Sequence, residues 1–186
     1  VGKLVRQNAF YSLKGILPVN QPCVVTPRQP GRIQFSICTI VNNDKKYRAC
    51  LADWQRHGFR GADCEFLFCD NRKSNLYDGY QSSRLFLDSA QGKYVVLTHL
   101  DSRPRVTKTA LLQILEDLEN LDPHWAIVGN AGVQQTTLRF VTLGLVMPNY
   151  SYRKHEEKYI QVETLDENLL IVKAEARLSL SHDLKG

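Results

Sequence analysis

The sequence predicts an α/β domain built on a doubly wound, mostly parallel sheet. Three strand-like runs occur in the first hundred residues, and each is followed by a polar turn and a helical pattern, which is the repeat that builds parallel sheets. The runs, residues 35–41, 64–69 and 94–100, are apolar and continuous rather than alternating, as is typical of strands buried on both faces.

The composition indicates one globular domain and excludes two classes of protein. The 186 residues are 43% hydrophobic and 23% charged, and they contain no apolar run of about 18 residues, so no transmembrane helix is expected. A net charge of +5 suits a phosphate-bearing ligand or weak association with anionic lipid, but it is too small for a nucleic-acid-binding surface. Five cysteines without Cys-x-x-Cys spacing predict buried free thiols in a reducing compartment.

Residues 1–32 are expected to form a lead-in, and residues 33–186 the domain, incomplete at its C-terminal end. A short helix up to Lys14 and then a linker interrupted by four prolines are predicted for the lead-in. A first residue other than methionine suggests a segment of a longer protein, and no signal peptide is recognisable. We therefore expect a cytoplasmic protein, at the inner face of the membrane.

Helices are predicted after each of the first three strands. Asp44 is expected to cap the first, which ends at Gly58 and buries Tyr47, Cys50, Leu51 and Trp54. A polar loop, residues 72–75, leads to the second, which runs to about Gln91 with its apolar side formed by Leu76, Tyr80, Leu85, Leu87 and Ala90. Pro104 is expected to start the third, which ends near Pro123 and buries Leu111, Leu112, Leu115 and Leu118.

The remainder of the chain is predicted to add strands and loops. Residues 125–128, 140–147 and 169–172 are strand-like, and the last is expected to enter the same site from the other side. Residues 129–132 form a flexible glycine-rich turn, and residues 150–159 a polar and aromatic surface loop.

The first three strands end in side chains suited to binding a ligand. These are Asn42 and Asn43, then Asp70 and Asn71, then His99 and Asp101. If the strands are parallel, these groups gather along one edge of the sheet, where α/β folds bind ligands. Two structural alternatives remain open: Asp101 as the cap of the helix after Pro104, and Asp70 with Asn71 as ordinary turn formers.

Several of these segments resemble a known family. Residues 35–43, then Cys69-Asp70-Asn71, then residues 90–94 leading into His99-Leu100-Asp101, resemble the front half of the inverting glycosyltransferases of family two, with their A-type nucleotide-diphospho-sugar-binding fold. The likeness is to the bacterial branch whose metal motif is His-x-Asp. Residues 128–133 and 164–167 also resemble that branch, so the likeness covers roughly residues 35–174.

The resemblance implies a Rossmann-like nucleotide-binding half and a metal site. Asp101 matches the carboxylate that binds Mn²⁺ or Mg²⁺ against the diphosphate, and a hard cation of this kind takes its other ligands from phosphate and water. His99 stands where many relatives have an aspartate, so its metal role stays open. The nucleotide-sugar-binding positions implied are Ile40, Asn42, Asp70, Asn71, Arg84, His99 and Asp101.

The expected function is therefore inverting, metal-assisted glycosyl transfer in bacterial polysaccharide biosynthesis. The donor is a nucleotide-diphosphate sugar and the acceptor a glycan or a lipid-linked molecule. Inversion needs a carboxylate base; Asp166 is the candidate within the chain, and the main base is expected beyond Gly186. The alternative is a non-catalytic nucleotide-sugar-binding or scaffold module of the same fold.

Overall fold

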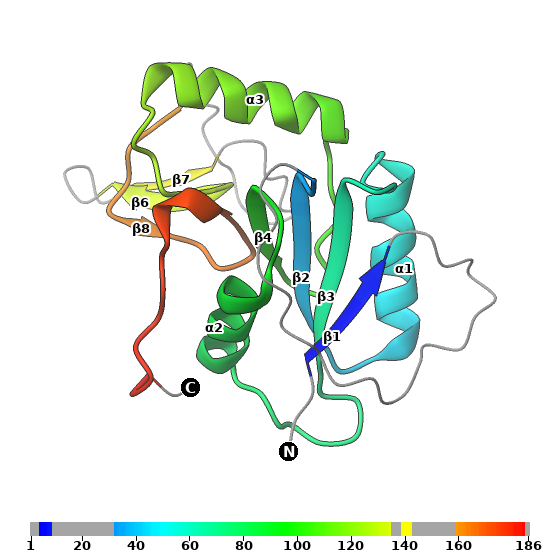
Figure 1. Ribbon diagram of the computed structural model, residues 1–186. Coiled ribbons are helices and arrows are strands. Elements are labelled where there is room, and N and C mark those ends of the chain that lie inside the picture. Colours follow the sequence, from blue (N-terminus) through cyan, green and yellow to red (C-terminus); the bar gives the residue numbers. More distant parts are fainter. Residues whose placement is uncertain (1–3, 9–31, 135–138, 143–158, 185–186) are drawn as a thin grey trace.

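The computed structural model describes residues 4–8, 32–134, 139–142 and 159–184, which form two sheets and three α-helices (Figure 1). The main sheet has six strands in the order β1-β3-β2-β4-β9-β5. Its strands are β1 (Leu4–Asn8), β2 (Phe35–Val41), β3 (Cys64–Asp70), β4 (Tyr94–Thr98), β5 (Ile127–Gly129) and β9 (Leu169–Lys173). The second sheet has three strands in the order β7-β6-β8, namely β6 (Ala131–Gln134), β7 (Arg139–Thr142) and β8 (Thr164–Leu165).

The predicted fold class is wrong, because the main sheet is mixed rather than mostly parallel. Only two of its five strand pairs are parallel, β2 with β3 and β2 with β4. The pairs β1 with β3, β4 with β9, and β5 with β9 are antiparallel. The parallel repeat therefore stops after β4. In a Rossmann-like sheet the next strand beside β4 would be parallel, but here that position is taken by β9, which comes from much later in the chain.

The first helix, α1 (Asp44–Arg56), matches the prediction except at its start. Its buried residues are the four predicted ones, Tyr47, Cys50, Leu51 and Trp54. The N-cap is Asn43, whose side chain accepts a hydrogen bond from the backbone nitrogen of Lys46 at 2.9 Å, and Asp44 is the first helical residue. Asp44 there has a favourable interaction with the helix dipole.

The second helix, α2 (Gly79–Ser89), is shorter than predicted and buries a different face. Asp78 is its N-cap, and its buried residues are Ser82, Phe86 and Ser89. Leu76 and Tyr80, predicted on the apolar side, are 51% and 45% exposed. The predicted face was wrong because two of the three residues that α2 buries are serines. Their small side chains let the helix pack closely on the sheet, and a search for apolar periodicity does not detect them.

Later segments also differ from the predictions in detail. The third helix, α3 (Lys108–Leu121), begins four residues after Pro104 and is capped by Thr107. The 129–132 stretch is no flexible turn, since β5 ends at Gly129 and β6 starts at Ala131. Residues 4–8, where a helix was predicted, form β1 on β3, and a short 3₁₀ helix, η2 (Ala174–Ala176), follows β9. The linker 9–31, residues 143–147 of the predicted strand and the loop 150–158 lie outside the described residues.

The helices cover both faces of the main sheet, with α1 and α3 on one face and α2 on the other (Figure 1). On the first face, Phe59 makes edge-on ring contacts with both Phe35 and Trp54. Four cysteines of the described part of the chain, Cys38, Cys50, Cys64 and Cys69, are free and buried, as predicted. Burial raises the pKa of the Cys64 and Cys69 thiols to about 12, so they stay protonated and unreactive. None of the three helices is long and apolar enough to cross a membrane.

A buried polar network closes the amino end of the parallel strands. Glu65 is 1% exposed, and its Oε1 accepts hydrogen bonds from Ser36 Oγ at 2.5 Å and from the backbone nitrogen of Gln91 at 2.7 Å. Ser36 Oγ in turn accepts from the backbone nitrogen of Gly92 at 2.8 Å. The network ties the chain entering β4 to β2 and β3 at the end of the sheet opposite to the strand ends predicted to bind a ligand.

Gly92 in this network permits a test of the packing. A Cβ added at Gly92 would lie 2.6 Å from the backbone nitrogen of Ser36, whereas one added at Gly79 meets nothing within 4 Å. Gly92→Ala is expected to lower the free energy of unfolding by about 1–3 kcal/mol, because the backbone of β2 must shift. The control Gly79→Ala should leave it unchanged or raise it by about 0.5 kcal/mol. Urea unfolding followed by circular dichroism measures both, and equal stability of the two variants would contradict the close approach.

Candidate functional site

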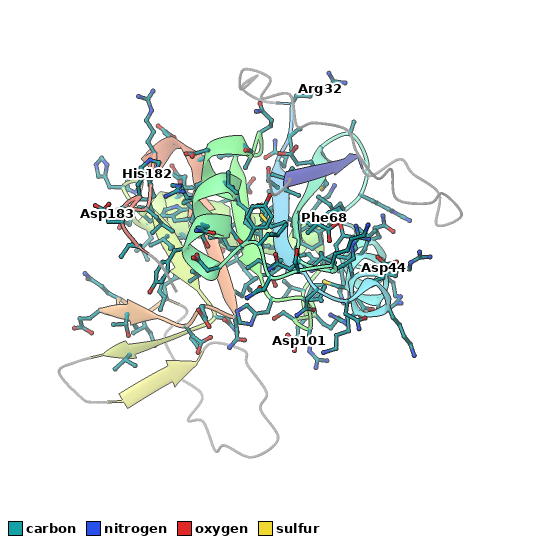
Figure 2. The ribbon with its side chains drawn as sticks, turned by 90° about the horizontal axis from the view of Figure 1, so that it is seen from below. Arg32, Asp44, Phe68, Asp101, His182 and Asp183 are labelled. Atoms are coloured by element: carbon teal, nitrogen blue, oxygen red, sulfur yellow. The ribbon has the colours of Figure 1, made fainter. Side chains whose placement is uncertain are left out.

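The carboxyl ends of β3, β2 and β4 lie along one edge of the main sheet, as the sequence predicts. Val41 at the end of β2 is the register partner of Asp70 at the end of β3, and Cys38 pairs with Leu97 near the end of β4. Asn42 and Asp101 follow directly beyond these ends. Figure 2 shows Asp44 and Asp101 together in one region, with Arg32, which precedes β2, at the opposite edge of the view. We call the region from Asn42 through Asp70 to Asp101 the carboxyl edge.

An arginine occupies the centre of the β3 end of the carboxyl edge. Arg72 binds Asp70 through Nε at 2.8 Å and Nη2 at 2.7 Å, and it binds Asp44 of α1 through Nη1 at 2.6 Å. Its guanidinium also lies 5.6 Å from the ring centroid of Phe68. All three guanidinium nitrogens therefore donate to carboxylates, and the two acids and the arginine form one ion-pair network joining β3 to α1.

The network stabilises the charged form of all three side chains. The hydrogen bonds from Arg72 hold the pKa of Asp70 and of Asp44 below the ordinary value, although partial burial opposes this. The hydrogen bond to Asp70 and then that to Asp44 raise the pKa of Arg72. Asp70 is thus an ionised partner of Arg72, and most of its acceptor capacity is used by that residue.

Asn71 forms a turn rather than part of the ligand site. Its Oδ1 accepts from the backbone nitrogens of Leu76 and Tyr77 at 3.0 and 3.1 Å, and its Nδ2 donates to Asn75 and to the carbonyl oxygen of Tyr77. The alternative of an ordinary turn former is therefore confirmed for this residue. Asn42 is exposed, and no described residue contacts its side chain by a hydrogen bond.

The loop that carries Asp101 is held from the side of α1. Arg103 forms an ion pair with Asp53 of α1, with Nε and Oδ2 2.7 Å apart. The same guanidinium donates through Nη1 to the carbonyl oxygens of Leu100 and Ser102, at 3.0 and 2.9 Å. Because these two carbonyls flank Asp101, Arg103 determines the shape of the loop on both sides of that residue.

The same loop is held from the side of β9 by Asn168. The carbonyl oxygen of Asn168 accepts from the backbone nitrogen of His99 at 3.4 Å and from Ser102 Oγ at 3.3 Å. Asp166 fixes the turn that presents this carbonyl, because its Oδ1 accepts from the backbone nitrogen of Asn168 at 2.9 Å and from its Nδ2 at 2.5 Å. Asp166, the predicted catalytic residue, therefore has a turn-forming role in this structure.

Asp101 itself is exposed, and no described residue binds its carboxylate. The alternative that it caps the following helix is wrong, since Thr107 caps α3 by accepting from the backbone nitrogen of Ala110 at 3.2 Å. His99 is also exposed, and its Nε2 lies 3.8 Å from Oε1 of Glu167. The loop thus presents one exposed carboxylate, which no described residue binds, with a histidine two residues before it.

Two predicted binding residues, Ile40 and Arg84, make no side-chain hydrogen bond or ion pair at the carboxyl edge among the described residues, although Ile40 lies next to that edge as the register partner of Cys69. Ile40 packs with the cluster of apolar side chains under α2, which includes Tyr77 and Phe86. Arg84 lies in the middle of α2, and it makes no hydrogen bond or ion pair within the described part of the chain. Conversely, Arg72, Arg103 and Asn168 organise the edge and were not predicted. Arg72 had a usable signal, an arginine two residues after a strand-end aspartate, whereas Arg103 and Asn168 act over long sequence separations.

The donor set at the carboxyl edge fits a divalent cation only in a limited way. No group of three or more histidine, cysteine or acidic side chains gathers to hold a metal among the described residues. The exposed carboxylate of Asp101 is still a suitable oxygen ligand, because Mg²⁺ is often bound through one or two carboxylates plus phosphate and water. A cation therefore fits at Asp101 only together with a phosphate-bearing ligand.

Together, the fold and the edge define a mixed-sheet α/β domain with a polar site at the carboxyl ends of its parallel strands. Comparison with known proteins adds one relative, a protein of Fuscovulum blasticum named "ATP synthase subunits region ORF 6". It is 29% identical to this chain over 173 residues, which are 89% of this chain and 68% of the relative. No family model matches the chain.

The predicted function is corrected by these findings. The name of the relative points to the ATP synthase subunits region, and it does not support a glycosyltransferase, an inverting transfer or polysaccharide biosynthesis. The structure adds a physical reason, because Asp166 is bonded within its own turn and Asp70 within an ion-pair network, so neither is poised as a base. The alternative of a non-catalytic module on the glycosyltransferase fold falls with the fold class. The resemblance of the motifs to family two stays a prediction.

The Arg72 network predicts an acid-dependent loss of stability. The folded-state pKa of Asp70 and of Asp44 lies below the ordinary 3.8, so their ion pairs stabilise the fold above about pH 4, and this stabilisation is lost as pH falls through the lowered values. Arg72→Met should lower the free energy of unfolding by about 1 kcal/mol at about pH 7, since the acids are partly exposed, and by less at about pH 2.5.

Urea unfolding at the two pH values measures this difference. The matched control is Arg48→Met, which removes only the exposed Arg48–Asp44 pair and should cost less than about 0.5 kcal/mol at either pH. A cost for Arg72→Met that is the same at both pH values would contradict the ion-pair account.

Proposed function

We propose that the chain binds a nucleoside phosphate, together with a divalent cation, at the carboxyl edge, and that it acts with the subunits of ATP synthase as a binding protein. The observation that carries the proposal is the state of Asp101. Its carboxylate is exposed and has no partner among the described residues, on a loop that Arg103 and Asn168 hold from two sides. A loop fixed in this way presents a ligand group without an ordering cost at the moment of binding.

The charge around the edge suits phosphate groups. Lys45 and Lys46 at the start of α1, Lys73 after β3 and Arg105 after β4 are exposed, and each lies near one of the three strand ends. The amino end of α1 adds backbone N–H groups and the positive end of the helix dipole at the same edge. Beside these cations, and unlike Asp44 and Asp70, Asp101 offers a carboxylate that no described residue binds, so it suits a cation bound with phosphate.

The cation at Asp101 is Mg²⁺ or Mn²⁺ in this proposal. Asp101 would hold the cation, which would neutralise part of the charge of the phosphate groups. The proposed ligand corresponds to the nucleoside diphosphate part of the nucleotide-diphosphate sugar that the sequence predicts, without the sugar. Asn42 is in position to contact the ligand, because it is exposed beyond the central strand and its side chain is not engaged by the described residues.

The link to ATP synthase rests on the name of the F. blasticum relative. It agrees with the chemistry of the site, since ADP and ATP carry the phosphate groups for which Asp101 and its surroundings are suited. Adenine nucleotides are therefore the ligands to test first. A cytoplasmic place at the inner face of the membrane remains part of the proposal.

Calorimetric titration of ADP, with and without Mg²⁺, tests the site. The unaltered chain should bind ADP at least about tenfold more tightly with Mg²⁺ than without it. Asp101→Asn should abolish this metal dependence, because the amide carries no charge. Asp183→Asn, at an exposed position far from Asp101 in Figure 2, is the matched control and should bind as the unaltered chain does. Metal-independent binding, or binding unchanged in Asp101→Asn, would contradict the site.

The link to ATP synthase has a separate test. Purified ATP synthase subunits are passed over the immobilised chain in the presence of Mg²⁺ and ADP, and retention is expected with the unaltered protein. If the nucleotide binds but no subunit is retained, the partner is wrong and the site stands. If a subunit is retained without nucleotide binding, the site is wrong and the partner stands.

A further inference from the structure

We infer a second binding site, for a small apolar α-amino acid, on the face of the sheet covered by α2. A cavity of about 210 Å³ lies there between α2, the pair β4 and β9, and the segment that follows η2, which runs beside α2 in Figure 1. Its lining residues are Leu87, Asp88, Val95, Val172, Ala174, Arg177, Leu178 and Ser179. This inference does not rest on the proposed function.

The floor of the cavity is apolar and rigid. Val95 of β4 and Val172 of β9 are register partners in the antiparallel ladder, and they are 1% and 2% exposed. Leu87 of α2 and Ala174 of η2 complete this floor, and the backbone nitrogen of Ala174 donates to the carbonyl oxygen of Lys93 at 2.9 Å. Because the strand backbone is already hydrogen-bonded, the apolar part of the lining suits an apolar side chain, while Asp88, Arg177 and Ser179 make the rest of the lining polar.

Two opposite charges stand on different walls of the cavity. Asp88 comes from α2 and Arg177 from the segment after η2. Both side chains are exposed, no ion pair joins them, and neither side chain has another partner among the residues that the structure describes. A carboxylate and a guanidinium therefore stand at the open rim of one small cavity without being paired to each other.

The backbone at Arg177 is unusual for an arginine. Arg177 adopts the left-handed conformation, with φ 52° and ψ 38°, at the C-cap of η2, and its nitrogen donates to the carbonyl oxygen of Ala174 at 3.2 Å. Glycine or asparagine is favoured in this conformation, since a larger side chain is strained there. An arginine at this turn gives the cavity a charged group that glycine cannot supply, and the cavity and its charges carry the argument independently of the strain.

These features together select one class of ligand. The guanidinium suits a carboxylate, the carboxylate of Asp88 suits an ammonium group, and the valine floor suits a short hydrocarbon chain. An α-amino acid such as leucine has all three groups. The volume is below the roughly 300–1,000 Å³ of sites for drug-sized molecules, so it suits a ligand as small as an amino acid.

The cavity is separate from the carboxyl edge. Val95 is the second residue of β4, whereas Asp101 lies beyond the carboxyl end of that strand. The cavity also lies on the α2 face, whereas the loop of Asp101 is held by Arg103 to α1. Binding at one site can therefore be measured while the other is altered.

Titration of the full chain with L-leucine tests the inference, with backbone amide NMR as the readout. Saturable shifts are expected for the amides of Leu87, Val95 and Ser179. Two analogues each remove one charge: 4-methylpentanoate lacks the ammonium group and 3-methylbutylamine lacks the carboxylate. Each should bind at least about tenfold more weakly than L-leucine, because one charged wall is left unpaired. Glycine, which lacks the hydrocarbon chain, should also bind more weakly.

Variants of the two charged walls sharpen the test. Asp88→Asn should weaken L-leucine at least about tenfold yet leave 4-methylpentanoate unaffected, and Arg177→Gln should weaken L-leucine but not 3-methylbutylamine. Arg84→Gln, on the same helix but outside the lining, is the matched control and should bind as the unaltered chain does. If a variant fails to fold, the analogue series on the unaltered chain decides alone.

Two results would overturn the inference. One is the absence of saturable shifts at the cavity residues up to about 10 mM L-leucine, which is weaker than an affinity of any biological use. The other is equal binding of L-leucine and both analogues, which would show an apolar cavity that does not read charge.

Discussion

The parallel pairing of β2 with both β3 and β4 is the constraint on which the rest of this structure depends. It brings the ends of three strands, separated by about thirty residues each along the chain, to one edge, and it leaves both faces of the sheet to be covered by helices. The buried Glu65–Ser36–Gly92 network secures the opposite end of the same three strands. Because a buried carboxylate must be hydrogen-bonded, this network also makes the register of β2, β3 and the entry to β4 costly to change.

Polar contacts at the carboxyl edge divide into those that hold the fold and those left for a ligand. Arg72 forms ion pairs with Asp44 and Asp70. The side chains of Asn71 and Asp166 accept hydrogen bonds from backbone nitrogens within their own turns. Asp101 remains, on a loop that these and other contacts hold in place. The number of acidic residues at a strand edge is therefore a poor guide to a site. What matters is which carboxylates remain without a partner after the fold has used the others.

Local patterns were reliable wherever the determining contacts lay close in the sequence. The strand Phe35–Val41, the buried face of α1 and the free buried thiols followed directly from residue type and spacing. The start of α1 at Asn43 rather than Asp44, and the serine face of α2, were missed because a capping hydrogen bond and a close helix-to-sheet approach depend on the exact placement of neighbours. The sequence did not predict that β9 pairs with β4 in the antiparallel direction, which is what makes the sheet mixed. The residues of one strand do not indicate in which direction it will pair with its neighbour.

The sequence by itself determined the three parallel strands, the polar residues at their ends and the position of Asp101 just beyond a buried strand, because hydrophobic runs and the residues that end them are local properties. Only the tertiary structure decided that Asp70 belongs to Arg72, that Arg103 and Asn168 shape the loop of Asp101, and that Asp88 and Arg177 face one cavity. Most of these contacts join residues that lie on different elements, many of them far apart in the chain. Even Arg72, which is close to Asp70 in the sequence, binds a second carboxylate from α1. Which partner a charged side chain takes depends on the packing that brings the elements together, and no spacing in the sequence encodes it.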